Sequence, residues 1–230
     1  MCLDVDDTLI DFSSAGRRAL ATMIGRADMW ELWEHITDAH VAMVVSGDLE
    51  YAHMHRQRTK CFLAELGVVL EDADAARFER ARAATMRLGF RLYDDVLPCL
   101  DWLRAAGVRI AAVTNASGGH QRTKVETLGL SRFIDHIAIA GEVGAAKPDP
   151  LIFHSACAAL DCGPAEAVHI GDRLEADAVG ARDAGLSGVW LNRGGGTAQA
   201  PEGVYEIGGL DELPQLLVCE FARLGAPAQR

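Results

Sequence analysis

Hydrophobic and polar positions follow two different patterns along this chain. Between Ser13 and Phe90, apolar residues recur at helical spacing, as at Met29, Leu32 and Trp33, and the segment contains no proline. This pattern predicts four or five helices. The breaks between them are expected near Gly47-Asp48, Gly67 and Glu71-Asp72.

The rest of the chain alternates short apolar runs with segments of helical pattern. Strands are expected at Met1–Leu3, Val108–Val113, His136–Ala140, Ala167–Ile170, Gly188–Leu191 and Val204–Ile207. Helices are expected at about Leu100–Ala106, Gly119–Leu128, Leu151–Leu160, Asp177–Ala184 and Leu210–Leu224. Such alternation is typical of α/β proteins, in which helices cover both faces of a parallel sheet. We therefore predict a Rossmann-like parallel-sheet core from residues 1–12 and 94–230, with an all-helical insert at residues 13–93.

Composition narrows the classes of function. The 230 residues are 50% apolar, which is enough for one sizeable core or a core with a small lobe. Acidic residues outnumber basic ones by 33 to 22, and the formal charge of −11 argues against a protein that binds nucleic acid or an anionic membrane surface. No apolar run approaches the roughly 18 residues of a membrane span. The first residues, MCLDVDD, lack the basic and apolar regions of a secretory signal.

The six cysteines form no C-x-x-C pair, and most lie among apolar residues. Cysteines in such surroundings behave as small hydrophobic residues, which favours reduced thiols in a cytoplasmic protein. His53 and His55 lie close together, but no second ligand pair follows at the spacing of a zinc site. We therefore expect a cytoplasmic protein without disulfides or zinc.

Polar signatures follow four of the predicted elements. They are Asp4-Val5-Asp6-Asp7-Thr8, Thr114-Asn115, Lys147-Pro148, and Gly171-Asp172 with Asp177. In a doubly wound sheet, ligands bind at the carboxyl ends of the strands, so we expect these side chains to meet. Crowded carboxylates stay ionised only beside a cation, and hard oxygen ligands suit Mg²⁺. An ammonium, a hydroxyl and loop amides suit a phosphate dianion, and Lys147 is one of only three lysines in the chain.

The order and spacing of these signatures resemble the haloacid dehalogenase-like (HAD) hydrolase superfamily. Its first motif is D-x-D-x-T, its second a Thr or Ser that ends a strand, its third a Lys often followed by Pro, and its fourth G-D-x-x-x-x-D. The matching positions are Asp4 to Thr8, Thr114, Lys147-Pro148, and Gly171-Asp172 with Asp177. The resemblance covers nearly the whole chain. The helical insert resembles the family's C1 cap, which closes over substrate, and this implies a small phosphorylated metabolite as partner.

The resemblance implies a role for each catalytic position. Asp4 resembles the nucleophile that attacks phosphorus and forms an aspartyl-phosphate. Asp6 resembles the general acid that protonates the leaving oxygen and then the base that activates water. Thr114 and the backbone amide of Asn115 would bind phosphate oxygens. Lys147 would neutralise both Asp4 and the transferring group.

The same resemblance implies a Mg²⁺ site. Asp4, the backbone carbonyl of Asp6, and Asp172 would bind the ion, with water and phosphate completing its shell. Asp177 resembles a supporting or auxiliary ligand. A dianionic substrate can approach anionic Asp4 only when Mg²⁺ and Lys147 offset the repulsion.

Several alternatives stay open beside phosphomonoester hydrolysis. A dehalogenase is disfavoured because halide leaves without a proton and family dehalogenases lack a carboxylate at the position of Asp6. A phosphonatase would use a cap lysine, but Lys60 has polar neighbours that indicate a solvated face. A sugar-phosphate mutase and a non-catalytic phosphate-binding protein remain, with either a monomer or a homodimer as the assembly. Because family members usually carry more residues before the nucleophile, we expect the native start to lie upstream of Met1.

Overall fold

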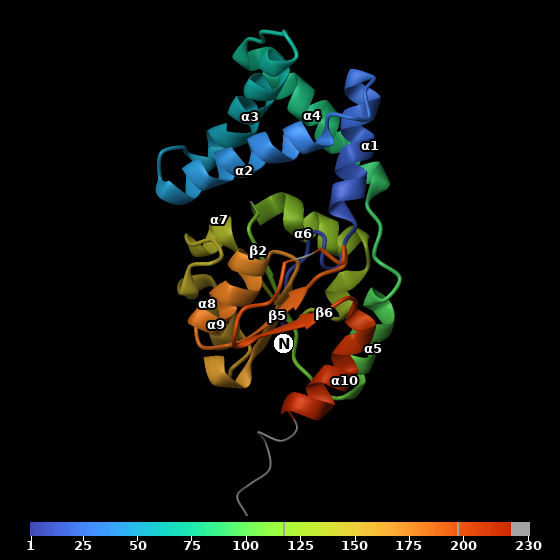
Figure 1. Cartoon of the computed structure of the whole chain (residues 1–230), viewed down its shortest axis with the longest axis vertical. Coiled ribbons are helices and arrows are strands. Elements are labelled where there is room, and N and C mark those ends of the chain that lie inside the picture. Colours follow the sequence, from blue (N-terminus) through green and yellow to red (C-terminus); the bar gives the residue numbers. More distant parts are fainter. Residues whose placement is uncertain (117, 197, 222–230) are drawn as a thin grey trace, which may run out of the picture. The chain divides into compact units, whose positions relative to one another are not determined.

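The computed structural model describes residues 1–116, 118–196 and 198–221 (Figure 1). The chain divides into two compact units. The core unit comprises Met1–Asp11 and Arg91–Arg230, and the helical unit comprises Phe12–Phe90. The predicted fold class, an α/β parallel-sheet core with an all-helical insert, is confirmed.

The core unit is built on a sheet of six strands among the described residues. All its pairings are parallel, and the strand order is β3-β2-β1-β4-β5-β6. The strands are β1 (Cys2–Leu3), β2 (Ala111–Thr114), β3 (His136–Ile139), β4 (Val168–Gly171), β5 (Ser187–Leu191) and β6 (Val204–Ile207). β1 has only two residues, yet it is central and pairs with both β2 and β4. Its burial on both faces agrees with the continuous apolar runs that predicted the strands.

The second strand begins later than its apolar run predicts. Val108 donates its backbone amide to Leu103 at 3.0 Å, so this part of the run closes the preceding helix instead of joining the sheet. Pairing with the short first strand begins only at Ala111, whose amide donates to the Met1 carbonyl at 2.8 Å. The Ile110 amide donates to the Asp135 carboxylate at 2.8 Å, so hydrogen bonds outside the sheet, rather than local β-propensity, precede this boundary.

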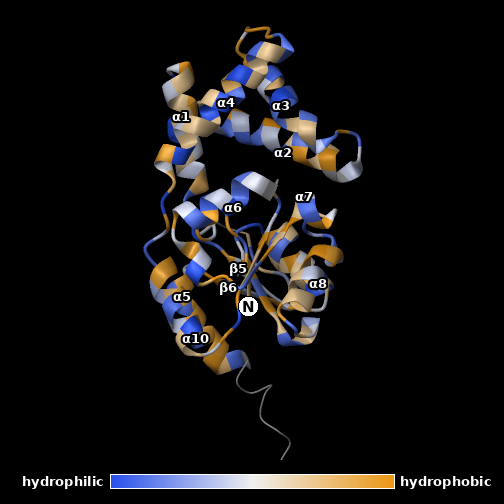
Figure 2. Ribbon diagram, turned by 180° about the vertical axis from the view of Figure 1, so that it is seen from behind, coloured by the Kyte–Doolittle hydropathy of each residue, from blue (hydrophilic) through white to orange (hydrophobic). Residues whose placement is uncertain are grey.

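Helices cover both faces of the sheet. In Figure 1, α8 and α9 lie on one side of the sheet, and α5 and α10 lie on the other. Figure 2 shows α5, α8 and α10 with hydrophobic and hydrophilic residues interleaved, as expected for helices with one face against a sheet. Their bounds are α5 (Val96–Ala105), α6 (Gly118–Thr127), α7 (Ala140–Val143), α8 (Pro150–Ala159), α9 (Gly180–Asp183) and α10 (Leu213–Leu216).

Two predicted helices are more irregular than their patterns suggest. The helix expected from Asp177 begins three residues earlier as a π-helical turn, Leu174–Val179, and continues as α9. The helix expected over Leu210–Leu224 consists of a 3₁₀ turn, α10 and a π-helical turn. The 3₁₀ turn spans Leu210–Glu212 and the π-helical turn spans Leu217–Phe221. Residues 222–224 of that prediction lie outside the described residues.

The helical unit has a small core of its own. Its helices are α1 (Phe12–Ile24), α2 (Trp30–Ser46), α3 (Tyr51–Glu65) and α4 (Asp72–Gly89). Trp33 packs edge-on against Phe62, with ring centroids 5.0 Å apart. The guanidinium groups of Arg58 and Arg82 lie 4.3 and 4.8 Å from the Trp33 ring. The tryptophan therefore serves as a packed core residue.

Lys60 lies on an exposed part of α3, away from the core of the helical unit. Its ammonium nitrogen lies 2.7 Å from Asp72 Oδ1, and its side chain is 38% exposed. This is a solvated surface ion pair, which contributes little to stability. It gives no support to a Schiff-base role for this lysine.

Two further features concern the described helices and cysteines. None of the helices in the described parts of the chain is both long and apolar enough to cross a membrane. All six cysteines lie in these parts, and each is a free thiol.

Candidate active site

Two neighbouring strands deliver carboxylates to one edge of the sheet. Asp4 follows β1 and Asp172 follows β4, and the two strands pair with Leu3 opposite Ile170. The direction in which successive strands are added reverses between β1 and β4, and open α/β sheets bind ligands at such a position. The Asp4 amide donates to the Ile170 carbonyl at 2.9 Å, so the hydrogen bonds between β1 and β4 extend as far as Asp4. Together with Asp177, these residues place three carboxylate oxygens within 4.8 Å of one another.

Lys147 is the buried cation of this cluster. Its side chain is 3% exposed, and Nζ lies 2.6 Å from both Asp4 Oδ1 and Asp177 Oδ1. Nζ also donates to the Val113 carbonyl in β2 at 3.0 Å. Burial acts to lower the pKa of Lys147, but the two carboxylates outweigh it and raise that pKa above its ordinary value. The ammonium is therefore charged at neutral pH.

Asp177 already has partners for both of its oxygens. Oδ1 accepts from Lys147 and from Nε2 of the buried His169, the latter at 3.0 Å. Oδ2 accepts from the Arg173 amide at 3.0 Å. Burial acts to raise the pKa of Asp177, yet Lys147 and His169 hold it well below its usual range. A Cβ at Gly171 would overlap the Asp177 carboxylate, which explains why glycine precedes Asp172 in this motif.

The cluster carries more negative charge than its one ammonium can offset. Asp4 Oδ2 is buried and accepts no hydrogen bond from the described residues. Burial, partly offset by Lys147, raises the pKa of Asp4 to about 6. Burial and the charges of Asp4 and Asp177 raise the pKa of Asp172 to about 8. A divalent cation bound through carboxylate oxygens would relieve this repulsion, so the donor set of Asp4 and Asp172 fits Mg²⁺.

The end of β2 supplies polar groups for an anion. Thr114 is 2% exposed, and its hydroxyl accepts a hydrogen bond from Gln121 Nε2 at 3.0 Å. The Asn115 side chain makes two hydrogen bonds to the backbone of Lys147. Its Nδ2 donates to the Lys147 carbonyl at 2.9 Å, and its Oδ1 accepts from the Lys147 amide at 2.7 Å. The sequence suggested a role only for the backbone amide of Asn115, whereas its side chain also positions the lysine.

Asp6 lies in the loop after β1 with its carboxylate 27% exposed. Lys124 Nζ lies 2.6 Å from Asp6 Oδ1, and Gln121 Nε2 lies 3.4 Å from Asp6 Oδ2. Both partners come from α6, and motif reasoning missed them. The rarity of lysine and the three-residue spacing of Gln121 and Lys124 are the signals that could have indicated them.

The loops around the carboxylates are tied to the sheet. Arg193, which follows β5, donates to the Thr8 carbonyl at 2.9 Å and pairs with Asp95 at 2.7 Å. Trp190 Nε1 donates to the Asp172 carbonyl at 2.9 Å. These hydrogen bonds and the ion pair fix the backbone of the loops that carry the motif residues, which favours a preorganised site.

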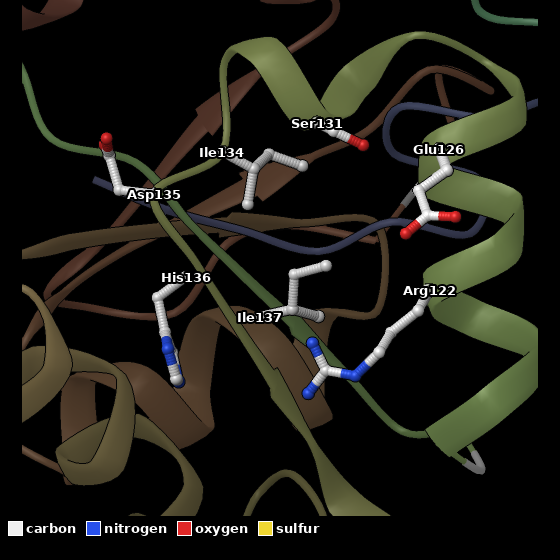
Figure 3. Close-up of a pocket in the computed structure, with 7 residues that line it drawn as sticks. All are labelled: Arg122, Glu126, Ser131, Ile134, Asp135, His136 and Ile137. Atoms are coloured by element: carbon white, nitrogen blue, oxygen red, sulfur yellow. The ribbon is translucent and has the colours of Figure 1, made fainter.

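A separate hollow of about 260 Å³ lies beside α6 and β3 (Figure 3). Its lining contains Arg122, whose guanidinium is already paired with Glu142 at 2.5 Å. None of the motif residues lines it. The residues shown in Figure 3 are Arg122, Glu126, Ser131, Ile134, Asp135, His136 and Ile137. The candidate chemistry is therefore at the strand ends and not in this hollow.

Known proteins resemble this chain over most of its length. The glyceraldehyde 3-phosphate phosphatase of Methanopyrus kandleri is 34% identical over 195 residues, which are 83% of this chain and 82% of that protein. The phosphoserine phosphatase of Thermus thermophilus is 38% identical over 130 residues, 54% of this chain and 52% of that protein, so this match spans about half of each. The HAD-hydrolase YfnB of Bacillus subtilis, solved bound to magnesium, is 25% identical with a TM-score of 0.83, covering 94% of this chain and 97% of that one.

The family's own sequence profile matches the chain directly. The profile of haloacid dehalogenase-like hydrolases covers residues 1–185, which include every motif position named above. The strand order and the carboxylate cluster at the reversal between β1 and β4 give that match a physical basis. The protein is therefore an enzyme of the haloacid dehalogenase-like hydrolase family.

Proposed function

We propose that the protein is a Mg²⁺-dependent phosphatase that hydrolyses a small phosphomonoester through an aspartyl-phosphate on Asp4. The observation that carries this proposal is the buried cluster in which Lys147 bridges two carboxylates while Asp4 Oδ2 has no partner among the described residues. The two relatives described above are named as phosphatases of small phosphorylated molecules, which supports the same class of reaction here. We place the enzyme in the cytoplasm, where its free thiols would stay reduced.

The residues can divide the reaction into two steps. In the first, an Asp4 oxygen forms a bond to phosphorus while the bond to the leaving oxygen breaks, and Asp6 gives that oxygen a proton. In the second, Asp6 takes a proton from water as the water oxygen bonds to phosphorus and the bond between phosphorus and the Asp4 oxygen breaks. This releases inorganic phosphate and restores the Asp4 carboxylate. Lys147 offsets the charge of Asp4 throughout, and Thr114 offers a hydroxyl to phosphate oxygens.

Asp4, Asp172 and the backbone carbonyl of Asp6 would hold the Mg²⁺ ion. When bound, Mg²⁺ supplies a positive charge that allows an anionic substrate to approach an anionic nucleophile. Asp6 distinguishes this proposal from dehalogenation, because a halide leaving group needs no proton whereas an alkoxide does.

Phosphate release from a panel of phosphomonoesters is the direct test. We expect release with Mg²⁺ and almost none with excess EDTA, because the cluster lacks the charge balance that an anionic substrate needs. The panel should contain glyceraldehyde 3-phosphate, phosphoserine, sugar phosphates, nucleotides and p-nitrophenyl phosphate. Asp4→Asn protein purified in the same way controls for contaminating phosphatases. Equal release in EDTA, or no release from any ester by folded protein, would contradict the proposal.

Stabilisation by Mg²⁺ should increase with pH. In the folded protein the pKa of Asp172 is about 8, against 3.8 for the free side chain, so folding favours its protonated form. The metal-free protein should therefore lose stability as pH rises from about 4 to 8, and Asp4 adds to this loss between about 4 and 6. Mg²⁺ needs the ionised carboxylates. Saturating Mg²⁺ should thus raise the melting temperature by about 5 °C or more at pH 8.5 and by less at pH 6.

The matched variant for this measurement is Asp172→Asn. It removes a carboxylate whose ionised form is disfavoured by folding, so the metal-free variant should be at least as stable as wild type at pH 8.5. The melting temperature of this variant should also change very little when Mg²⁺ is added. Two results would argue against metal binding by this cluster. One is a Mg²⁺-induced rise in the wild-type melting temperature that is the same at both pH values, and the other is an equal rise in Asp172→Asn.

A further inference from the structure

The carboxylate of Asp6 is held by one face of α6. Lys124 Nζ lies 2.6 Å from Asp6 Oδ1, and Gln121 Nε2 lies 3.4 Å from Asp6 Oδ2. The same Gln121 amide donates to the Thr114 hydroxyl at 3.0 Å. Two residues three positions apart on a helix share a face, so one face of α6 contacts both the proposed proton donor and the proposed phosphate-binding hydroxyl.

These contacts differ from an ordinary surface ion pair. The side chain of Lys124 is only 8% exposed, and Gln121 is 2% exposed. Lysine is almost never buried without a specific reason, because its stem and its charge both lose solvent freedom. The chain has three lysines: Lys60 is a surface residue, Lys147 is in the carboxylate cluster, and Lys124 contacts Asp6.

The contacts constrain how Asp6 can deliver a proton. A general acid must lie within hydrogen-bond reach of the leaving oxygen, and small misplacements of catalytic groups cost large factors in rate. Oδ1 accepts from the Lys124 ammonium at 2.6 Å, whereas Oδ2 accepts only the longer bond of 3.4 Å from the neutral Gln121 amide, so Oδ2 is the oxygen that can carry the transferable proton. The ammonium at Oδ1 also restricts the rotation of the carboxyl group.

We infer that Lys124, supported by Gln121, is a positioning residue that orients the Asp6 carboxyl for proton transfer to the leaving group. The inference rests on the proposed phosphatase function and deepens it. In the step concerned, the bond between phosphorus and the leaving oxygen breaks, its electron pair stays on that oxygen, and the proton of Asp6 Oδ2 moves to the same oxygen. Lys124 contacts neither substrate nor phosphorus in this step.

A comparison of two leaving groups tests the inference. p-Nitrophenyl phosphate releases a phenolate that needs little help from a proton, whereas phenyl phosphate, of similar shape, releases a more basic phenolate that depends on general-acid catalysis. The quantity to measure is kcat/KM with Mg²⁺, since it reports the first irreversible step, the transfer to Asp4. We expect Lys124→Met to lower kcat/KM by about 10–100-fold for phenyl phosphate and by less than about 3-fold for p-nitrophenyl phosphate.

Three further variants make the result specific. Asp6→Asn should show the same selective loss to a larger degree, because it removes the acid itself. Lys124→Arg keeps a cationic donor at this position and should recover most of the activity on phenyl phosphate. Arg122→Met removes another ion-paired cation of α6, which pairs with Glu142 on the surface, and should leave both substrates unaffected.

Each outcome bears on one claim. Equal losses on both esters in Lys124→Met, no loss on either, or the same selective loss in Arg122→Met would overturn the positioning role while the proposed function stands. Hydrolysis of neither ester by wild type would overturn the proposed function and the inference with it. If Lys124→Met hydrolyses p-nitrophenyl phosphate, the active site of that variant is correctly folded. If that variant does not fold, Lys124→Gln should show the same selective loss.

Discussion

Asp4→Asn is expected to abolish phosphate release, with a loss of roughly four orders of magnitude or more, while the protein stays folded. A carboxamide oxygen cannot form the aspartyl-phosphate on which the proposed reaction depends. It can still accept a hydrogen bond from Lys147, and Asp177 still neutralises that ammonium. Because burial raises the pKa of Asp4 to about 6, its charge at pH 8 opposes folding, and its removal should not lower stability at that pH.

The experiment is a comparison of kcat/KM and of thermal unfolding for wild type and Asp4→Asn at pH 8. Asp161→Asn is a matched control, because it makes the same chemical change at an exposed residue of the core unit. Asparagine also tolerates the left-handed backbone that Asp161 adopts, with φ of +51°. Activity of Asp4→Asn within about tenfold of wild type would refute Asp4 as nucleophile.

Lys147→Met is expected to cost both activity and stability. The side chain is 3% exposed and pairs with Asp4 and Asp177 at 2.6 Å, so its removal leaves buried carboxylates without their cation. Breaking a buried ion pair from one side typically costs about 3–5 kcal/mol of folding free energy. Activity should fall by at least about 10²-fold, since the charge that offsets Asp4 and the incoming phosphate is gone.

The pH dependence of unfolding separates this electrostatic effect from loss of packing. In metal-free Lys147→Met, the free energy of unfolding should rise as pH falls from 8 to 5, because protonation removes the uncompensated charge, and the rise should exceed that of wild type. Lys60→Met removes a surface lysine and should leave both activity and stability nearly unchanged. If Lys147→Met were as stable as wild type at pH 8, the claim that this lysine balances the cluster would fail.

For the motif residues, the sequence pattern alone predicts which side chains meet in the fold. Asp4 and Asp172 are 168 positions apart, yet each follows an apolar run that reads as a strand. Parallel strands end at the same edge of their sheet, so strand prediction alone indicates that their carboxylates meet there. The strand order and the group of carboxylate oxygens within 4.8 Å agree with that expectation. The functional roles of these residues stay predictions for the experiments above.

The residues that the sequence did not indicate are polar partners on helices and loops. Gln121 and Lys124 lie in the segment GGHQRTKVET, whose only apolar side chain is Val125. So weak a pattern does not determine which face of the helix turns inward. The hydrogen bonds between the Asn115 side chain and the Lys147 backbone likewise join two loops, and no local sequence pattern predicts them.

Sequence by itself determined the class of fold, the helical insert and the ordered set of carboxylates, threonine and lysine, because these depend on local periodicity and on the shared edge of parallel strands. Tertiary structure alone decided where strands start and which polar groups touch. The Ile110 amide donates to the Asp135 carboxylate and the Val108 amide to the Leu103 carbonyl, so Val108 and Ile110 stay outside the sheet although they belong to the predicted strand. The docking of α6 brings Lys124 to Asp6 across 118 residues, and only packing in three dimensions sets such contacts.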